Sequence, residues 1–186
     1  MSRFSIQALP LKGLKRLLRQ RLGDSRGSLT RMFCALELEN AGWQQSIAQI
    51  NHTYTARKGT IRGLHYQLPP HAEMKLISCI RGEVWDLAVD LRANSPTFLK
   101  WHAEYLTADN GFSLLIPEGF AHGFQCLTND VELLYCHSSA YVPTVERGVH
   151  PLDASLAIDW PLPITELSHK DSEHPKLNLS FKGLEI

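Results

Sequence analysis

The segment TIRGLHYQ, residues 60–67, carries the features that decide the fold and point to a site. It is rich in Ile, Leu and Tyr, a composition typical of a buried β-strand. The same eight residues include an ionisable histidine, His65, and a permanently charged arginine, Arg62, and both are costly to bury without partners or a ligand. Taken alone, the pair fits a hydrogen-bonded core histidine beside a solvated arginine. Other segments of the chain favour a functional site instead.

The spacing of these two residues conflicts with a regular strand. Arg62 and His65 are three residues apart, so an unbroken strand would point them to opposite faces. Both can serve one site only if a bulge or kink re-aims one of them, and glycine in a strand is typical of such a point. The sequence therefore predicts an irregularity near Gly63.

Further strands are predicted along the chain, and together they indicate an all-β domain. The candidates are residues 75–80, 84–91, 100–106, 112–116, 123–126 and 132–138, separated by Asn, Asp, Gly and Pro. Residues 81–83 have the spacing of a hairpin turn. In the strand predicted at residues 84–91, one face is wholly apolar and the other carries two carboxylates among small residues. This pattern fits a sandwich or barrel that packs one face and lines a polar cavity with the other. The apolar face is Trp85, Leu87, Val89 and Leu91, and the other is Val84, Asp86, Ala88 and Asp90.

Two segments have helical character. Residues 34–41 have a helical composition, and residues 11–22 place apolar side chains at three-to-four spacing, a local pattern that favours a helix. After residues 160–163 (WPLP) the sequence becomes polar and proline-rich, as expected of a tail that wraps a core. Without an internal repeat or linker, residues 1–186 are predicted to form one domain.

Composition excludes several classes of function. The chain has 186 residues, 44% of them hydrophobic, with 19 Lys and Arg against 19 Asp and Glu, so no general attraction to nucleic acid or membranes is expected. The basic cluster at 12–21 is interpreted as a solvated face. No run suits a bilayer span or a signal peptide, and the expected location is the cytoplasm. Reduced core thiols are predicted for Cys34, Cys79, Cys126 and Cys136.

A second motif, IPEGFAHGF at residues 116–124, follows a turn with a strand that begins near His122. With Gly59 and His65 it resembles the two half-motifs of the cupin β-barrel. The first half-motif is incomplete, because Gln67 occupies the position of its second metal-binding histidine. Lys75 lies near the position where a glutamate ligand would be expected. Two histidines beside a cation are a poor metal site, so no metal is predicted.

The chain resembles the dTDP-4-dehydrorhamnose 3,5-epimerase family of sugar-nucleotide epimerases, from about Asp24 to Asp171. The resemblance implies a cupin-like jelly-roll or β-sandwich barrel with a few short helices. It also implies a homodimer in which an N-terminal arm, about residues 1–30, reaches the neighbouring subunit. Within that arm, residues 11–22 are expected to be partly extended. A C-terminal tail is expected at about residues 160–186. The resemblance rests on the segments 24–27, 49–51, 61–66, 69–70, 75–76, 82–86, 90–92, 95–98, 116–124, 134–135 and 158–161.

The chemistry of such a family explains the residue types. Epimerisation beside a ketone removes a proton from one face of a carbon and returns one to the other, which needs a base, an opposite acid and a group that holds the enolate oxygen. The resemblance implies that His65 is the base, Asp171 its partner, Tyr135 the acid and Lys75 the cation near the ketone oxygen. No cofactor is implied, because the ketone of the substrate is the electron sink.

The resemblance also implies which residues bind a nucleotide-linked 4-keto-6-deoxy sugar. Arginines and amides are expected on the diphosphate and sugar, and a tyrosine near the cavity mouth could stack on the ligand. Two further polar residues are expected to line the pocket and to pair with each other. The amides and arginines are Arg26, Gln49, Asn51 and Arg62, the tyrosine is Tyr141, and the polar pair is Asp86 and His122.

One departure from the family concerns base recognition. Family members carry an aromatic pair and a glutamate where this chain has Leu29, Thr30 and Arg31. A CDP-linked rather than dTDP-linked substrate is therefore an alternative, and inversion at C3 alone, C5 alone or both stays open. A metal-dependent cupin enzyme and a non-catalytic sugar-nucleotide-binding module are the other hypotheses.

Overall fold

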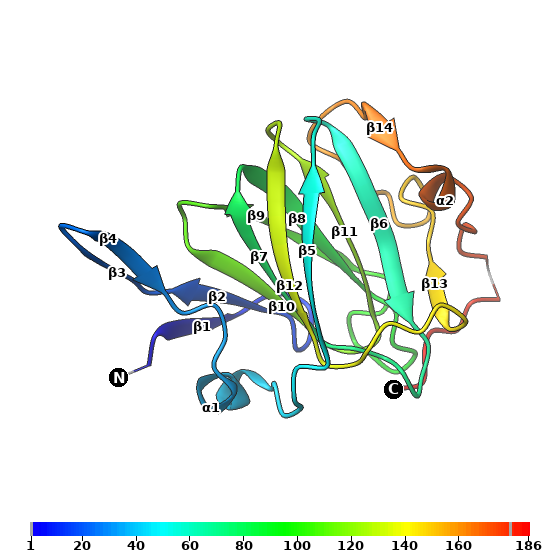
Figure 1. The fold of residues 1–186 in the computed structure, drawn as a ribbon. Helices are drawn as coiled ribbons and strands as arrows, with labels where there is room; N and C mark the ends of the chain where they lie inside the picture. Colours follow the sequence, from blue (N-terminus) through cyan, green and yellow to red (C-terminus); the bar gives the residue numbers. More distant parts are fainter. Residues whose placement is uncertain (1, 179) are drawn as a thin grey trace.

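Two facing β-sheets form the body of the computed structural model, which describes residues 2–178 and 180–186 (Figure 1). The first sheet has the order β1-β2-β10-β7-β12-β5, and all its neighbours are antiparallel. Its strands are β1 (Phe4–Ala8), β2 (Lys15–Arg19), β10 (Phe112–Ile116), β7 (Lys75–Arg81), β12 (Val131–His137) and β5 (Gln49–Thr55).

The second sheet has the order β13-β6-β11-β8-β9, and β14 pairs in parallel with β6. A separate hairpin, β3–β4, projects from the body at the N-terminal side. The expected all-β, cupin-like fold is confirmed. The remaining strands are β13 (Glu146–Gly148), β6 (Thr60–Gln67), β11 (Phe120–Cys126), β8 (Glu83–Asp90), β9 (Trp101–Thr107), β14 (Glu166–Leu167), β3 (Arg21–Asp24) and β4 (Gly27–Thr30).

Apolar side chains fill three layers. One cluster lies between the sheets and includes Ile77 and Leu133 from the first sheet and Phe124 from the second. Burial of such side chains is the main stabilising contribution, at about 25 cal/mol per Å² of apolar surface. A second cluster covers the outer face of the second sheet, where the C-terminal tail packs. A third lies under Trp43, on the outer face of the first sheet.

Strand β8 confirms the interpretation of its alternating pattern. Trp85 and Leu87 belong to the outer cluster under the tail. On the opposite face Ala88 packs between the sheets, and the fully buried Asp86 reaches His122. One face of the strand is therefore packed and the other carries polar groups into the interior, as the sequence indicated.

Two predictions of local structure were wrong. Gly82, with φ of +74°, does form a turn, but β7 and β8 lie in different sheets, so the segment is a crossover and not a hairpin. Residues 11–22 are not helical, because β2 pairs with β1 on one side and β10 on the other. Pairing on both sides outweighs the weak local helix propensity, as the family resemblance implied.

The helices are short. Residues 34–41 contain α1 (Ala35–Leu38) and the 3-10 turn η1 (Glu39–Ala41), which confirms the helical prediction there. In the tail, α2 (His169–Ser172) begins after Ser168, whose hydroxyl accepts a hydrogen bond from the Asp171 amide (3.0 Å). Among the described residues, no helix is long and apolar enough to cross a membrane.

The basic cluster at 12–21 is only partly solvated, which corrects its interpretation. Arg19 is buried and donates to the carbonyls of Gly111 (3.1 Å) and Phe112 (3.3 Å). Arg16 is paired with Glu104 at 2.9 Å. These arginines therefore join β2 to neighbouring strands. The four cysteines are free, as predicted.

Candidate active site

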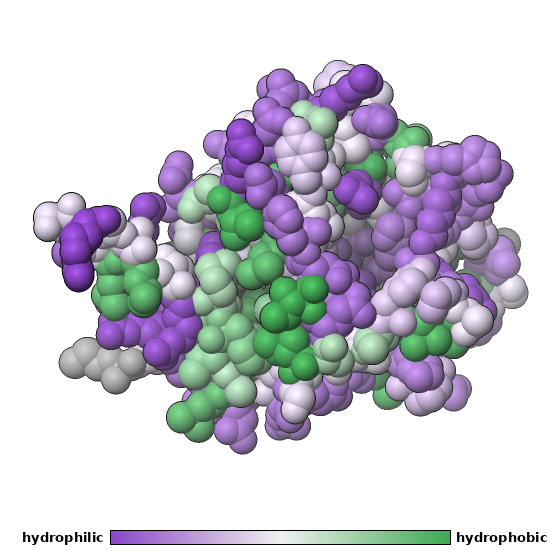
Figure 2. Space-filling view, in the orientation of Figure 1, coloured by the Kyte–Doolittle hydropathy of each residue, from purple (hydrophilic) through white to green (hydrophobic). Residues whose placement is uncertain are grey.

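A cavity of about 390 Å³ opens between the edge strand β5 of the first sheet and β6 of the second. Figure 2 shows a hollow in this place with a mainly hydrophilic rim. Its walls come from both sheets and, at the mouth, from the tail. The lining residues are Gln49, Asn51, Thr53, Arg62, His65, Tyr66, Gln67, Glu73, Lys75, His122, Phe124, Tyr135, His137, Tyr141, Glu146 and Lys170.

Strand β6 carries the predicted irregularity. Its register with β11 pairs His65 with His122 but Arg62 with Phe124, so β6 has one residue more than its partner across the same interval. Gly63 has a φ of +116°, and a Cβ there would lie 2.6 Å from the Cα of Gly123, so only glycine fits. The bulge turns both Arg62 and His65 toward the cavity, and the prediction at Gly63 is confirmed.

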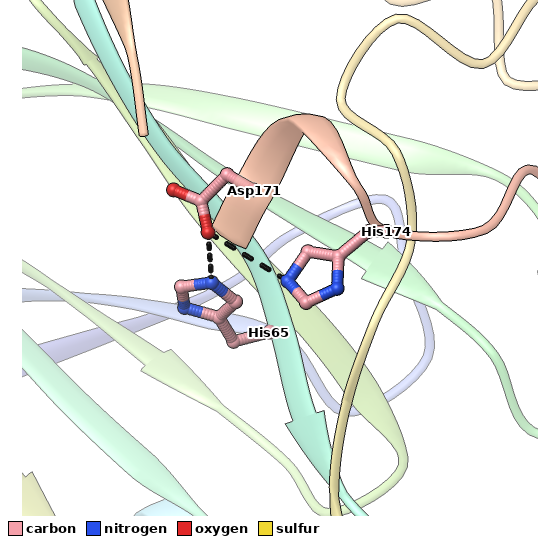
Figure 3. A group of neighbouring side chains, drawn as sticks. All are labelled: His65, Asp171 and His174. Atoms are coloured by element: carbon pink, nitrogen blue, oxygen red, sulfur yellow. Dashed lines mark hydrogen bonds and ion pairs between the residues drawn. The ribbon is translucent and has the colours of Figure 1, made fainter. Parts of the chain in front are cut away.

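The bulge also helps to hold a carboxylate behind His65. The N–H of Gly63 donates to Asp171 Oδ2 (3.2 Å). The other carboxylate oxygen of Asp171 lies 2.6 Å from His65 Nε2 (Figure 3). Burial by itself would raise the pKa of Asp171, but the hydrogen bonds from His65 and Gly63 outweigh it and hold that pKa below its ordinary value. The ionised carboxylate therefore keeps the proton on Nε2, and Nδ1 has the free lone pair.

Tyr135 faces the same cavity from β12 of the first sheet. Its side chain is buried, in edge contact with His122 and stacked at 5.9 Å on His137. Burial, together with the nearby Asp86 carboxylate, raises the pKa of Tyr135 well above its ordinary value. The phenol therefore stays protonated at neutral pH and has a proton to give.

Lys75 is held at the start of β7, close to the histidine wall. Its ammonium donates to the backbone carbonyl of His65 (3.2 Å) and pairs with Glu73 Oε1 (3.1 Å). The second oxygen of Glu73 lies 3.2 Å from His137 Nδ1. Burial would raise the pKa of Glu73, but Lys75 and His137 outweigh that effect and lower it. The lysine is thus a buried, positioned cation at the cavity.

The predicted pairing of Asp86 with His122 is confirmed, with 3.0 Å between Asp86 Oδ2 and His122 Nε2.

Gln67 occupies the position of a second cupin histidine, and its side-chain amide binds backbone groups instead. It donates to the carbonyls of His71 (3.0 Å) and Ala140 (3.2 Å) and accepts from the N–H of Val142 (2.7 Å). The residues of the cupin half-motifs therefore do not converge as metal ligands.

The expected ligand-binding residues divide into two groups. Gln49, Asn51, Arg62 and Tyr141 all line the cavity, and the Tyr141 hydroxyl donates to Glu146 (2.9 Å). Arg26 lies at the turn of the β3–β4 hairpin, outside this cavity, and pairs with Asp24 at 2.7 Å. Arg26 therefore does not reach the cavity of its own chain among the described residues, and its expected role depends on the predicted dimer.

Several residues of the site were missed from the sequence. Glu73 and His137 flank Lys75 and Tyr135, and Glu146 and Lys170 form an ion pair at the mouth (2.5 Å). His174 lies beside the His65–Asp171 pair. Tyr135 and His137 are two residues apart on β12 and share one face of that strand, and this spacing could have identified His137. Glu73 precedes β7, and no such spacing marks it.

These features define a class of protein: a cupin-like β-sandwich whose cavity holds a carboxylate-bound imidazole and a protonated phenol, groups suited to acid–base chemistry. A family model described as dTDP-4-dehydrorhamnose 3,5-epimerase matches residues 8–178, and the chain belongs to this family. Family members are isomerases that act on carbohydrates.

Individual relatives agree with this assignment. A dTDP-4-dehydrorhamnose 3,5-epimerase of Shigella flexneri is 45% identical over 150 residues, 80% of this chain and 82% of the relative. A Streptomyces niveus relative, named dTDP-4-dehydrorhamnose 3-epimerase, is 34% identical over 90% of this chain and 81% of its own length. The crystal structure of a Legionella pneumophila 3,5-epimerase in complex with dTDP-4-keto-L-rhamnose superposes with a TM-score of 0.91, at 37% identity and 98% coverage of both chains.

Proposed function

We propose that this protein inverts C3 and C5 of a dTDP-linked 4-keto-6-deoxyhexose, without a cofactor, for the synthesis of a surface polysaccharide sugar. One observation carries the proposal: an imidazole held by a carboxylate, His65 Nε2 to Asp171 Oδ1 at 2.6 Å, shares a cavity with a protonated tyrosine on the other sheet. The family assignment supports the same reaction.

The first step is proton removal beside the ketone. Nδ1 of His65 takes the proton from carbon, and the pair of electrons moves into the enolate, whose oxygen is stabilised by the ammonium of Lys75. The imidazolium that forms lies against the ionised Asp171, which offsets its charge. The half-buried position of His65 keeps it in reach of a substrate in the cavity.

The second step returns a proton to the opposite face. Tyr135 donates it as the enolate collapses to the ketone, and the configuration at that carbon is inverted. The tyrosinate must then regain a proton, and the proton held by His65 must leave, before the next turnover. Because Tyr135 is on the first sheet and His65 on the second, the substrate carbon is expected to lie between them.

The remaining polar groups of the cavity are proposed to bind the substrate. Arg62 suits a phosphate oxygen through its guanidinium fork, and the amides of Gln49 and Asn51 suit hydroxyl groups. The relatives carry dTDP in their names, which supports thymine over cytosine as the base. Leu29, which replaces an aromatic residue of the family, is 67% exposed and so free to contact a ligand or partner.

We also propose a cytoplasmic homodimer in which the β3–β4 hairpin brings Arg26 to the cavity of the partner subunit. Large apolar side chains exposed on this chain support an interface, among them Leu36 and Ile50. Figure 2 shows apolar atoms gathered around α1 and the nearby end of β5. The residues of the hairpin are largely exposed, which suits an arm that packs against another subunit.

The test is proton NMR in deuterated water with dTDP- and CDP-linked 4-keto-6-deoxyglucose. We expect deuterium at C3 and C5, with faster exchange of the dTDP substrate. Exchange at C3 alone would identify a 3-epimerase like the relative from Streptomyces niveus, and faster exchange of the CDP sugar would reverse the base assignment. Binding of either nucleotide without exchange at either carbon would contradict the proposal and favour a binding module.

A further inference from the structure

We propose that His65, Asp171 and His174 form a binding site for a divalent transition metal such as Zn²⁺, and that metal bound there stops turnover. The inference rests on the proposed function only for its effect on catalysis, because it needs His65 as the base. The site is separate from the cupin metal position, where Gln67 binds backbone.

The geometry converges on one oxygen. Asp171 Oδ1 lies 2.6 Å from His65 Nε2 and 3.6 Å from His174 Nε2 (Figure 3). One donor atom from each of the three residues lies within 4.8 Å of the other two. The rings of the two histidines are edge to face, with 5.3 Å between their centroids. Both imidazole nitrogens therefore face the same carboxylate oxygen.

His174 has a nitrogen that no other group uses. Its Nε2 is buried and has no hydrogen-bond partner among the described residues, and the 3.6 Å separation from Asp171 is too long for a hydrogen bond. A buried polar atom without a partner destabilises the folded protein. A metal ion bound to Nε2 would remove that destabilisation, so the orphaned nitrogen indicates a ligand position.

The fold makes room for this ring. Gly148, on β13, packs directly under it: a Cβ at residue 148 would lie 2.3 Å from the imidazole of His174. The backbone of α2 and the residues after it bring Asp171 and His174 to β6 together. Glycine at this point allows His174 to approach the base.

The donor set suits zinc. Two imidazoles and a carboxylate, with water in the fourth position, form a common Zn²⁺ site, with metal–ligand distances of about 2.0–2.2 Å. The cation of Lys170, on the same helix as Asp171, is paired with Glu146. To admit the ion, His65 and Asp171 must move apart from their 2.6 Å contact, and His174 must approach Asp171 from 3.6 Å.

Occupation of the site blocks the base through its tautomer. A neutral imidazole that coordinates a metal through Nε2 carries its proton on Nδ1, so the proton of His65 moves from Nε2 to Nδ1 as the metal binds. No proton is lost and no bond to the substrate changes. Nδ1 then has no lone pair to accept a proton from carbon. Because the rest of the cavity is untouched, kcat should fall while KM changes little.

The experiment measures Zn²⁺ binding and turnover separately. Calorimetric titration of the chelator-treated protein with Zn²⁺ gives affinity, and the epimerase assay with increasing Zn²⁺ gives inhibition. The test variants are His174→Phe, which keeps a ring against His65, and His174→Ala. The matched control is His169→Ala, an exposed histidine on α2. The thermal midpoint of each variant is recorded to verify folding.

We expect the wild type and His169→Ala each to bind one Zn²⁺, and in both proteins kcat should fall as Zn²⁺ binds. Both His174 variants should bind Zn²⁺ at least about tenfold more weakly and resist inhibition to the same extent, with metal-free turnover within about tenfold of the wild type. Equal binding and inhibition in the His174 variants would overturn the site. Binding without inhibition would retain the site but reject its effect on His65, and activation by Zn²⁺ would contradict the cofactor-independent mechanism itself.

Discussion

The two walls of the cavity place their key groups in different environments. On the second sheet, His65 is half-buried and is hydrogen-bonded to a charged group, the Asp171 carboxylate supplied by the tail. On the first sheet, Tyr135 is buried and is controlled mainly by desolvation, which raises its pKa. The second sheet thus presents a group that can accept a proton, and the first sheet presents a group that stays protonated. The two faces of a substrate carbon therefore meet a base on one side and an acid on the other.

The largest effect is expected from removing the base. His65→Asn keeps a polar side chain in the cavity but has no group that accepts a proton near neutral pH. We expect kcat to fall about 10³- to 10⁴-fold, at the upper end of what general acid–base catalysis contributes. Binding of dTDP should stay within tenfold of the wild type. Turnover and deuterium exchange that both survive the substitution would reject His65 as the base.

Removing the acid should separate exchange from inversion. Tyr135→Phe keeps the ring that stacks on His137 and removes only the hydroxyl. We expect inversion to fall about 10²- to 10³-fold. His65 can still remove a proton and return deuterium to the same face, so NMR should show label entering the substrate without a change of configuration. Loss of exchange in parallel with loss of inversion would show that the two walls do not act on separate faces.

The difference between the walls also explains which parts of the site could be predicted. The bulge at Gly63 follows from the three-residue spacing of Arg62 and His65, so the sequence alone was sufficient for it. The Asp86–His122 pair was expected from the family resemblance, and the structure shows it. The local pattern at 11–22 favours a helix, whereas the family resemblance implies an extended segment, and the structure agrees with the resemblance. The hairpin predicted at 81–83 was wrong. Strand pairing and sheet assignment both depend on partners distant in sequence.

The residues that surround the proposed acid, base and cation were harder to predict. Glu73 and His137 act through contacts between different strands, β12 and the turn before β7, and no local pattern shows that they meet. His174 reaches the base only because the tail folds back over β6 and Gly148 admits its ring. Asp171 was identified through the family resemblance, since as a local pattern it is an ordinary loop carboxylate.

Removing the charge that controls the base should affect both activity and acid stability. In Asp171→Asn, the amide no longer fixes the His65 tautomer. We expect kcat to fall about 10²-fold, at the lower end of what general acid–base catalysis contributes. The pKa of Asp171 is lowered in the folded state, so its stabilising contribution is present above the unfolded pKa, about 3.9, and is lost as pH falls through the folded value. Urea unfolding should therefore show the largest stability difference from wild type above about pH 5 and a smaller one toward pH 3. A difference that stays constant over this range would contradict the charge assignment.

The smallest effect on turnover is expected from the counter-ion of Lys75. Glu73→Gln keeps the shape of the side chain but leaves a buried ammonium without its carboxylate, 3.1 Å away in the wild type. Breaking a buried pair from one side costs about 3–5 kcal/mol of stability. Because Lys75 still donates to the His65 carbonyl (3.2 Å), it should keep its position, and kcat should fall by less than about tenfold.

A double-mutant cycle with Lys75→Met separates these two roles of the pair. The double variant removes both charges, so we expect it to recover much of the stability lost in Glu73→Gln while kcat falls further, because no cation faces the enolate oxygen. Chemical unfolding and steady-state kinetics on the four proteins measure both quantities. If the double variant is no more stable than Glu73→Gln, the carboxylate acts mainly through His137, its other partner at 3.2 Å, and not as the counter-ion of the lysine.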